Sequence, residues 1–336
     1  MSRDGMRAAL VIGLAASLSG AIALALALGG EAPAYAVLVG AVVVRPDFQR
    51  WPPLLYPVLL ALMGLCLGFG TVVAQLLADM PEVAQFALVT LVLRVAALLL
   101  PGKLLLISNL IPLGGVMALL SPDPSWSTWG QELIAMALGL LVGTGTQLLL
   151  APPGSGAIAE PEAPAAPDPP AARRLSLGLR SWFFWRKTVL LCLALPIGMA
   201  LGAVTPKYLY FGVLLLLSDS VEATSERVRD RIVGVSLGIA MPLLVFNSFG
   251  LSSVSTGLVM GGTAALVTAL GLTSFLRTAL ISSAIAFSGY GPLVAWYIPN
   301  RWLDYLMGSL LALGASLLQP NATSCCGSSH QGPSPP

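Results

Sequence analysis

Charged residues are scarce in this sequence. Only 10% of its 336 residues are charged and the net charge is +2, so we expect no surface that binds nucleic acid. Cys325, Cys326 and the one histidine, His330, fall in the tail, where two adjacent cysteines are poor evidence for a metal site, and the four cysteines give no readable disulfide framework. No glycine-rich loop precedes a lysine, and no nucleophile stands beside a general base. We therefore expect no enzyme, no cofactor and no metal.

Apolar residues are abundant instead. They make up 56% of the chain, and the mean hydropathy is +0.86. A chain of this composition cannot bury its apolar surface in one aqueous core, so we expect an all-α polytopic membrane protein. Arg3 and Arg7 precede the first apolar run, and A34-Y-A36 could pass for a cleavage site. That run exceeds the ~7–15 residues of a signal-peptide core, which favours a retained first helix.

The apolar runs predict about twelve transmembrane helices. The second and eighth runs are short for a bilayer that needs about 20 residues. The runs lie at 8–28, 34–44, 54–77, 83–100, 103–120, 131–150, 188–204, 208–218, 231–248, 253–271, 277–295 and 302–318.

Basic residues are distributed unevenly between the loops. With a cytoplasmic N-terminus, Lys207 and Arg301 fall outside, Arg94 lies within a span, and the other fourteen of the 17 basic residues fall inside. This positive-inside bias predicts a bacterial-type inner membrane protein with both termini in the cytoplasm. The fourteen are Arg3, Arg7, Arg45, Arg50, Lys103, Arg173, Arg174, Arg180, Arg186, Lys187, Arg227, Arg229, Arg231 and Arg277.

A proline- and alanine-rich segment separates two halves of six runs each. We interpret 151–187 as a cytoplasmic linker ending in a basic segment, and 320–336 as a disordered tail. The halves, 1–150 and 188–319, would be six-helix membrane repeats. Since each has an even number of spans, the repeats would be parallel.

Two short similarities support a duplication. Y35-A-V-L-V-G-A-V-V-V44 resembles Y208-L-Y-F-G-V-L-L-L-L217, and G64-L-C-L-G68 has the glycine spacing of G234-V-S-L-G238. Glycines four residues apart let helix backbones approach closely. We expect Gly234 and Gly238 to pack a helix, and Gly308 to do the same in the last span.

The stretch from Asp219 to Arg231 holds four acidic residues and three arginines. It predicts a helix that begins in the cytoplasm with Asp219 at its N-cap. Arg227 and Arg231 lie one turn apart, on the stripe that leads to the glycines of the membrane segment. They could form an entry funnel for organic anions, because arginine binds carboxylates with two hydrogen bonds.

A second interpretation of this stretch involves topology alone. The arginines would then keep the loop in the cytoplasm and pair with nearby acids, Arg229 with Glu226 and Arg227 with Asp230.

The second half resembles the FUSC family, the fusaric-acid-resistance and aromatic-acid-exporter group. The similarity rests on E226-R-V-R-D-R231, G234-x-x-x-G238 and R301-W-L-D304-Y-L-M-G308. The first half shares only the hydrophobic outline. The resemblance implies export of aromatic or other organic acids driven by the proton gradient, and the related plant malate channels imply passive anion conduction. Family members often carry a large cytosolic domain, in whose place this sequence has only the linker and tail.

Arg94 is the one basic residue that lies well inside a predicted span, away from its ends. A charge at mid-bilayer costs about 2.5–3.5 kcal/mol, so Arg94 should face the bundle or water. Asn109 lies at similar depth on the next span and could accept a hydrogen bond from it. Arg94 is either part of an anion site or a structural residue that extends toward the interface.

Two carboxylates lie within predicted spans. Glu132 and Asp304 occupy corresponding positions near the starts of the sixth and twelfth spans. Carboxylates beside small residues near the outer face could take up protons. Alternatively, Asp304 forms a salt bridge with Arg301 at an interface.

The sequence and the family resemblance therefore predict a proton-coupled secondary transporter that exports small organic carboxylates, with aromatic acids among those that the resemblance implies. A passive anion channel and a non-transporting membrane scaffold are the alternatives. The expected partners are the organic anion and the lipid bilayer, with a homo-oligomer left open. Substrate binding is assigned to Arg94, Asn109, Arg227 and Arg231, proton coupling to Asp304 and Glu132, and helix packing to Gly234, Gly238 and Gly308.

Overall fold

The computed structural model describes residues 3–100, 108–152, 169–203, 206–250, 252–290 and 294–318. These residues form thirteen α-helices and a short 3-10 helix, with no strand among them, which confirms the all-α prediction. The first helices are α1 (Arg3–Ala25), α2 (Ala32–Val43), α3 (Leu55–Leu76), α4 (Glu82–Ala97), α5 (Leu110–Leu119), α6 (Trp126–Leu150) and α7 (Ala171–Arg180). They are followed by α8 (Trp182–Ala200), α9 (Lys207–Leu216), α10 (Val221–Phe249), α11 (Ser253–Ala269), η2 (Thr273–Phe275), α12 (Leu276–Tyr290) and α13 (Val294–Leu317).

Each of the twelve predicted spans overlaps one α-helix, and α7 is additional. Among the described residues, four helices are long and apolar enough to cross a membrane: α1 from Asp4, α3, α6 and α8. They indicate a membrane-embedded protein. The predicted N-cap of α10 is wrong by one residue, because the Ser220 hydroxyl, rather than Asp219, accepts the Ala223 amide at 3.1 Å.

The described C-terminal part of the predicted linker 151–187 is helical. It forms α7 and the start of α8, where W182-F-F-W185 directly precedes Arg186 and Lys187. Residues 153–168 of the linker, Lys103 and the tail 320–336 lie outside the described residues. The basic pair before the seventh predicted span therefore belongs to a helix rather than to a loop.

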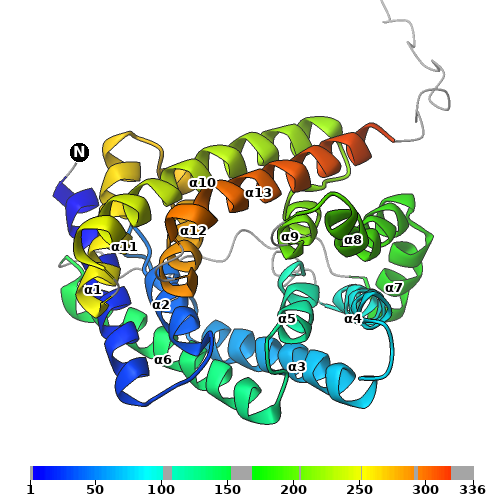
Figure 1. Ribbon diagram of the computed structural model, residues 1–336, viewed down its shortest axis with the longest axis horizontal. Helices are drawn as coiled ribbons and strands as arrows, with labels where there is room; N and C mark the ends of the chain where they lie inside the picture. The colour runs from blue at the N-terminus through cyan, green and yellow to red at the C-terminus, as the bar shows by residue number, and fades with distance from the viewer. Residues whose placement is uncertain are drawn as a thin grey trace, which may run out of the picture.

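The helices form two lobes joined by two bridges (Figure 1). Lobe A contains α1, α2, α11 and α12, and lobe B contains α4, α5, α8 and α9. The pair α3 and α6 joins the lobes along one side, and the pair α10 and α13 joins them along the other. Each lobe thus mixes helices from both halves of the sequence.

Corresponding helices make corresponding contacts in the two halves. In the first half α1 packs on α2, α2 on α6, α3 on both α5 and α6, and α4 on α5. In the second half α8 packs on α9, α9 on α13, α10 on both α12 and α13, and α11 on α12. Across the halves, the contact of α1 with α11 corresponds to that of α8 with α4.

Glycines set the distance between several of these helices. A β-carbon on Gly13 of α1 would lie 2.7 Å from the Gly257 carbonyl oxygen and 3.1 Å from the Gly261 Cα, both on α11. A β-carbon on Gly212 of α9 would lie 2.9 Å from the Gly308 Cα of α13. Only glycine allows backbones to approach this closely.

The two glycine pairs that look alike in sequence have different partners. A β-carbon on Gly64 or Gly68 would contact side chains of α6, whereas one on Gly234 or Gly238 would contact α12. The two pairs therefore share their spacing in sequence but do not pack in equivalent places, because they face different neighbours.

Candidate functional site

Three basic side chains lie near one another in lobe B, since Lys187 is close enough to Arg94 to interact electrostatically and shares the Phe183 ring with Arg186. Arg94 comes from the last turn of α4, and Arg186 and Lys187 from the first turns of α8. Arg186 is 7% exposed and Lys187 is 3% exposed, and Arg94 is partly buried. We call these three residues the cationic cluster.

Lys187 bridges three helices of lobe B. Its Nζ donates to the Leu217 carbonyl at 3.1 Å and to the Asn109 Oδ1 at 3.4 Å. Leu217 is the C-cap of α9 and Asn109 the N-cap of α5. The free carbonyls at a helix C-terminus carry partial negative charge, so Lys187 has favourable but neutral partners.

Arg186 is less well satisfied. Its Nη2 donates to the Ser218 carbonyl at 3.2 Å, while its Nε and Nη1 are buried without a hydrogen-bond partner among the described residues. Its guanidinium lies 5.6 Å from the Phe183 ring centroid, and Lys187 Nζ lies 5.7 Å from the same ring. Buried donors without partners are costly, so the two unpartnered nitrogens of Arg186 would gain from an added acceptor.

Arg94 also has only neutral partners. Its Nε and Nη2 donate at 3.4 Å to the Thr188 hydroxyl and the Phe184 carbonyl, and its guanidinium lies 5.0 Å from the Phe184 ring centroid. These hydrogen bonds are longer than the usual 2.9–3.0 Å and therefore weak. Asn109 was expected to accept from Arg94, but its Oδ1 accepts from Lys187.

The charge of the cationic cluster is poorly compensated. Among the described residues, none of its three side chains lies within 4.0 Å of a carboxylate oxygen. Asp219 is close enough to Arg186 to interact electrostatically, while Arg227 adds a further positive charge near Lys187. Burying cations without counterions costs several kcal/mol each, so this arrangement favours a bound anion.

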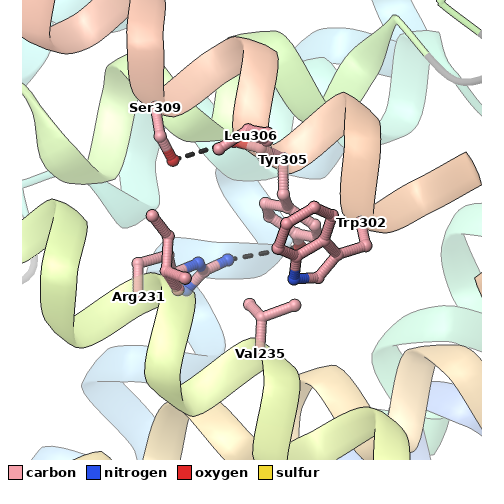
Figure 2. A pocket seen from close by; sticks show the side chains of 7 residues that line it. Arg231, Val235, Trp302, Tyr305, Leu306 and Ser309 are labelled. Atoms are coloured by element: carbon pink, nitrogen blue, oxygen red, sulfur yellow. Dashed lines mark hydrogen bonds between the residues drawn. The ribbon is translucent and has the colours of Figure 1, made fainter. Parts of the chain in front are cut away.

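The predicted arginine pair on α10 is divided between two environments. Arg227 is exposed and lies near the cationic cluster. Arg231 donates to the Tyr305 hydroxyl at 3.2 Å and lies 5.0 Å from its ring centroid (Figure 2). Trp302 and Ser309 line the same pocket, whose volume of about 10 Å³ is enough for roughly one water. The pocket has no room for an organic anion.

The local ion pairs expected on α10 differ from those found. Arg229 Nη2 lies 3.5 Å from Asp230 Oδ1, and the Arg229 side chain is 71% exposed. The described ion pairs do not include the expected bonds of Glu226 with Arg229 or Arg227 with Asp230. Exposed pairs of this kind contribute little, so they do not account for the charge of the stretch.

Both membrane carboxylates are buried. Glu132 of α6 is 4% exposed and Asp304 of α13 is 1% exposed. Glu31 and Tyr35 lie close enough to Glu132 to interact electrostatically. The side chain of Arg301, the expected partner of Asp304, lies outside the described residues.

Sequence reasoning alone misses Arg186 and Lys187 as site residues. It places them at the basic end of the cytoplasmic linker, directly before the seventh predicted span. The signal that could have found them is the run W182-F-F-W185 directly before the pair. Together with the apolar span that follows the pair, it places the two charges inside one apolar helix.

The chain matches no family model, no curated protein and no solved structure. The resemblance to the FUSC family therefore stays a prediction from three short motifs.

Proposed function

We propose that this protein transports small organic anions across a membrane, with the cationic cluster as its anion site. The observation that carries the proposal is the poorly compensated positive charge buried in lobe B by Arg186 and Lys187, beside Arg94. A carboxylate could accept a hydrogen bond from one of the two unpartnered nitrogens of Arg186 and neutralise Lys187. The direction is export from the cytoplasm, as the FUSC resemblance implies.

We further propose that the twelve helices other than α7 cross the membrane as two parallel six-helix repeats, with both termini in the cytoplasm. The matching contacts within the two halves, and the reciprocal contacts of α1 with α11 and α8 with α4, support a duplication. The positive-inside bias supports the orientation.

The proposed repeats supply an internal comparison for the cationic cluster. The contact of α1 with α11 corresponds to that of α8 with α4, and it is packed through Gly13, Gly257 and Gly261. Such a helix pair can thus be held by backbone contact without charge. Packing of this helix pair therefore does not require charged groups, which supports a binding role for Arg94, Arg186 and Lys187 beside the helix contacts that they make.

Low exposure of the cluster implies an occluded state. With Lys187 3% exposed and Arg186 7% exposed, an anion reaches them only after neighbouring helices move. Transport would alternate between this state and states open to either side. Buried Glu132 and Asp304 are the proposed proton-coupling groups, because a buried carboxylate can exchange a proton as its surroundings change.

Flux measurements on purified protein in liposomes test this function. Benzoate and a panel of aromatic and aliphatic carboxylates would be assayed with and without a pH gradient. We expect Lys187→Gln and Arg186→Gln to reduce flux at least tenfold per folded molecule. Arg229→Gln is the matched control, since that arginine is exposed and outside the cluster.

The same assay separates the alternatives. Flux that follows the anion gradient and ignores the pH gradient would favour a channel. A complete lack of carboxylate flux by well-folded wild-type protein would contradict transport and favour a membrane scaffold. Undiminished flux in both cluster variants would refute the assigned anion site.

A further inference from the structure

A second cavity lies in lobe A, between the end of α2 and the start of α12. Its volume is about 270 Å³, large enough for a compact organic molecule. Apolar side chains form one part of its lining: Val42, Val44, Leu276 and Leu280. Val44, Leu276 and Leu280 are at most 3% exposed, so this part of the lining belongs to the core.

The polar part of the lining contains two guanidinium groups. Arg45 and Arg277 lie 5.5 and 5.4 Å from the ring centroid of Trp51. Arg45 makes two hydrogen bonds to Asp47, at 3.0 and 2.7 Å, which neutralise it. Arg277 has no carboxylate within 4.0 Å among the described residues. Arg277 is exposed to solvent, so its guanidinium offers the cavity a positive charge that no described carboxylate pairs.

The loop after α2 is held in place by hydrogen bonds. The Gln147 side chain of α6 accepts from the Arg45 amide at 3.2 Å and donates to the Gln49 carbonyl at 3.0 Å. Asp47 accepts the Gln49 amide at 3.1 Å, and the Phe48 ring is 2% exposed. The polar groups are thus positioned before any ligand arrives, which reduces the entropy cost of binding.

We propose that this cavity binds an amphipathic organic monoanion, with a carboxylate on Arg277 and a compact apolar body against the α2 and α12 side chains. Exposed Thr273 and Ser274 also line it and can donate hydrogen bonds to the anion. A dianion fits less well, because its second charge would approach Asp47. A neutral alcohol of the same shape should bind more weakly, because it has no negative charge to pair with Arg277.

The cavity corresponds in position to part of the cationic cluster. In lobe B the end of α9 and the start of α5 supply Leu217 and Asn109, the partners of Lys187. Under the proposed duplication α2 corresponds to α9 and α12 to α5. The end of α2 and the start of α12 are therefore the corresponding elements in lobe A. One lobe thus has buried cations at this place and the other an open cavity. The choice of a carboxylate rests in part on the proposed function, but the binding test does not require transport.

Protection of a single cysteine tests the proposal. Ser274→Cys places a thiol on the exposed rim, and its alkylation by a maleimide would be followed on the peptide that contains position 274. Benzoate is the probe, with phthalate as the dianion and benzyl alcohol as the neutral analogue. We expect benzoate to slow alkylation and the other two to have much weaker effects.

Charge removal then identifies the group responsible. In the Ser274→Cys background, Arg277→Gln should raise the half-protecting benzoate concentration at least tenfold, which is about 1.4 kcal/mol. Arg277→Lys should retain most of the protection, which checks that the site is still folded. Arg50→Gln is the matched control, because Arg50 is an exposed arginine near the same loop and does not line the cavity.

Two results would overturn the proposal. One is equal protection by benzoate with and without the Arg277 charge, and the other is equal protection by benzyl alcohol. Neither result depends on flux. Protection without liposome transport would support binding in this cavity and reject the proposed function. Transport without protection would support the proposed function and reject binding in this cavity.

Discussion

Replacing Lys187 by methionine should abolish transport while leaving the fold intact. The change keeps much of the side-chain volume and removes the charge. It also removes the hydrogen bonds to the Leu217 carbonyl and to Asn109. Leaving the carbonyl unsatisfied costs about 1–3 kcal/mol.

The loss is offset by the removal of a buried cation. Lys187 is 3% exposed, and Arg94 and Arg227 lie close enough to repel it. Desolvation of an ion inside a protein costs several kcal/mol, and this cost disappears in the variant. We therefore expect a net change within about 2 kcal/mol of zero. For a chain of this size that corresponds to a Tm shift of less than roughly 8 °C. We expect the Tm to rise rather than fall, because the removed desolvation cost exceeds the cost of the lost hydrogen bonds.

Tm and benzoate flux should be measured on the same purified Lys187→Met protein, with Arg229→Met as the exposed control. A purely structural lysine gives a different outcome. The variant would then lose much of its stability or expression, while each surviving folded molecule would transport at the wild-type rate. Observing that combination would refute the anion site.

Three further predictions concern packing, coupling and topology. Gly13→Ala should lower the Tm, because its β-carbon would overlap the α11 backbone at a cost of about 1–3 kcal/mol. Gly145→Ala is the control: a β-carbon there meets open space, so the Tm should stay the same or rise slightly. Glu132→Gln should remove the response of flux to a pH gradient while retaining exchange of anions down their own gradient, as measured in liposomes. Reporter fusions after Gly154 and Pro336 should both give cytoplasmic signals, and an external signal from either would contradict the twelve-span orientation.

The helices could be predicted well from hydropathy because each apolar segment is bounded by charge, proline or glycine. The prediction failed where charge lies inside a helix. Arg186 and Lys187 lower the local hydropathy, yet the aromatic residues before them keep the same helix face apolar. A window average cannot distinguish a charged loop from a helix that buries its charges against another helix.

The partners of individual residues were harder to predict than the helices. Arg227 and Arg231 lie one turn apart on α10, but they face different neighbours, because α13 brings Tyr305 to Arg231 and α8 brings Lys187 near Arg227. Gly64 and Gly234 have the same spacing to a second glycine and still face different helices. Spacing within one helix defines a face, and only the tertiary arrangement decides what covers that face.

The two lobes suggest how one scaffold could serve both packing and binding. Where α1 meets α11, small residues let the backbones touch, and that contact contributes stability without a charged group. Where α4 meets α8, Arg94 donates across the contact, and on α8 Nε and Nη1 of the neighbouring Arg186 have no partner among the described residues. Such a contact is less stable than its counterpart unless something supplies the missing acceptors. An anion would supply them, and its binding energy would be available to favour the occluded state over the open ones. On this argument the poorly satisfied contact is the element through which a bound anion changes the conformation of the protein.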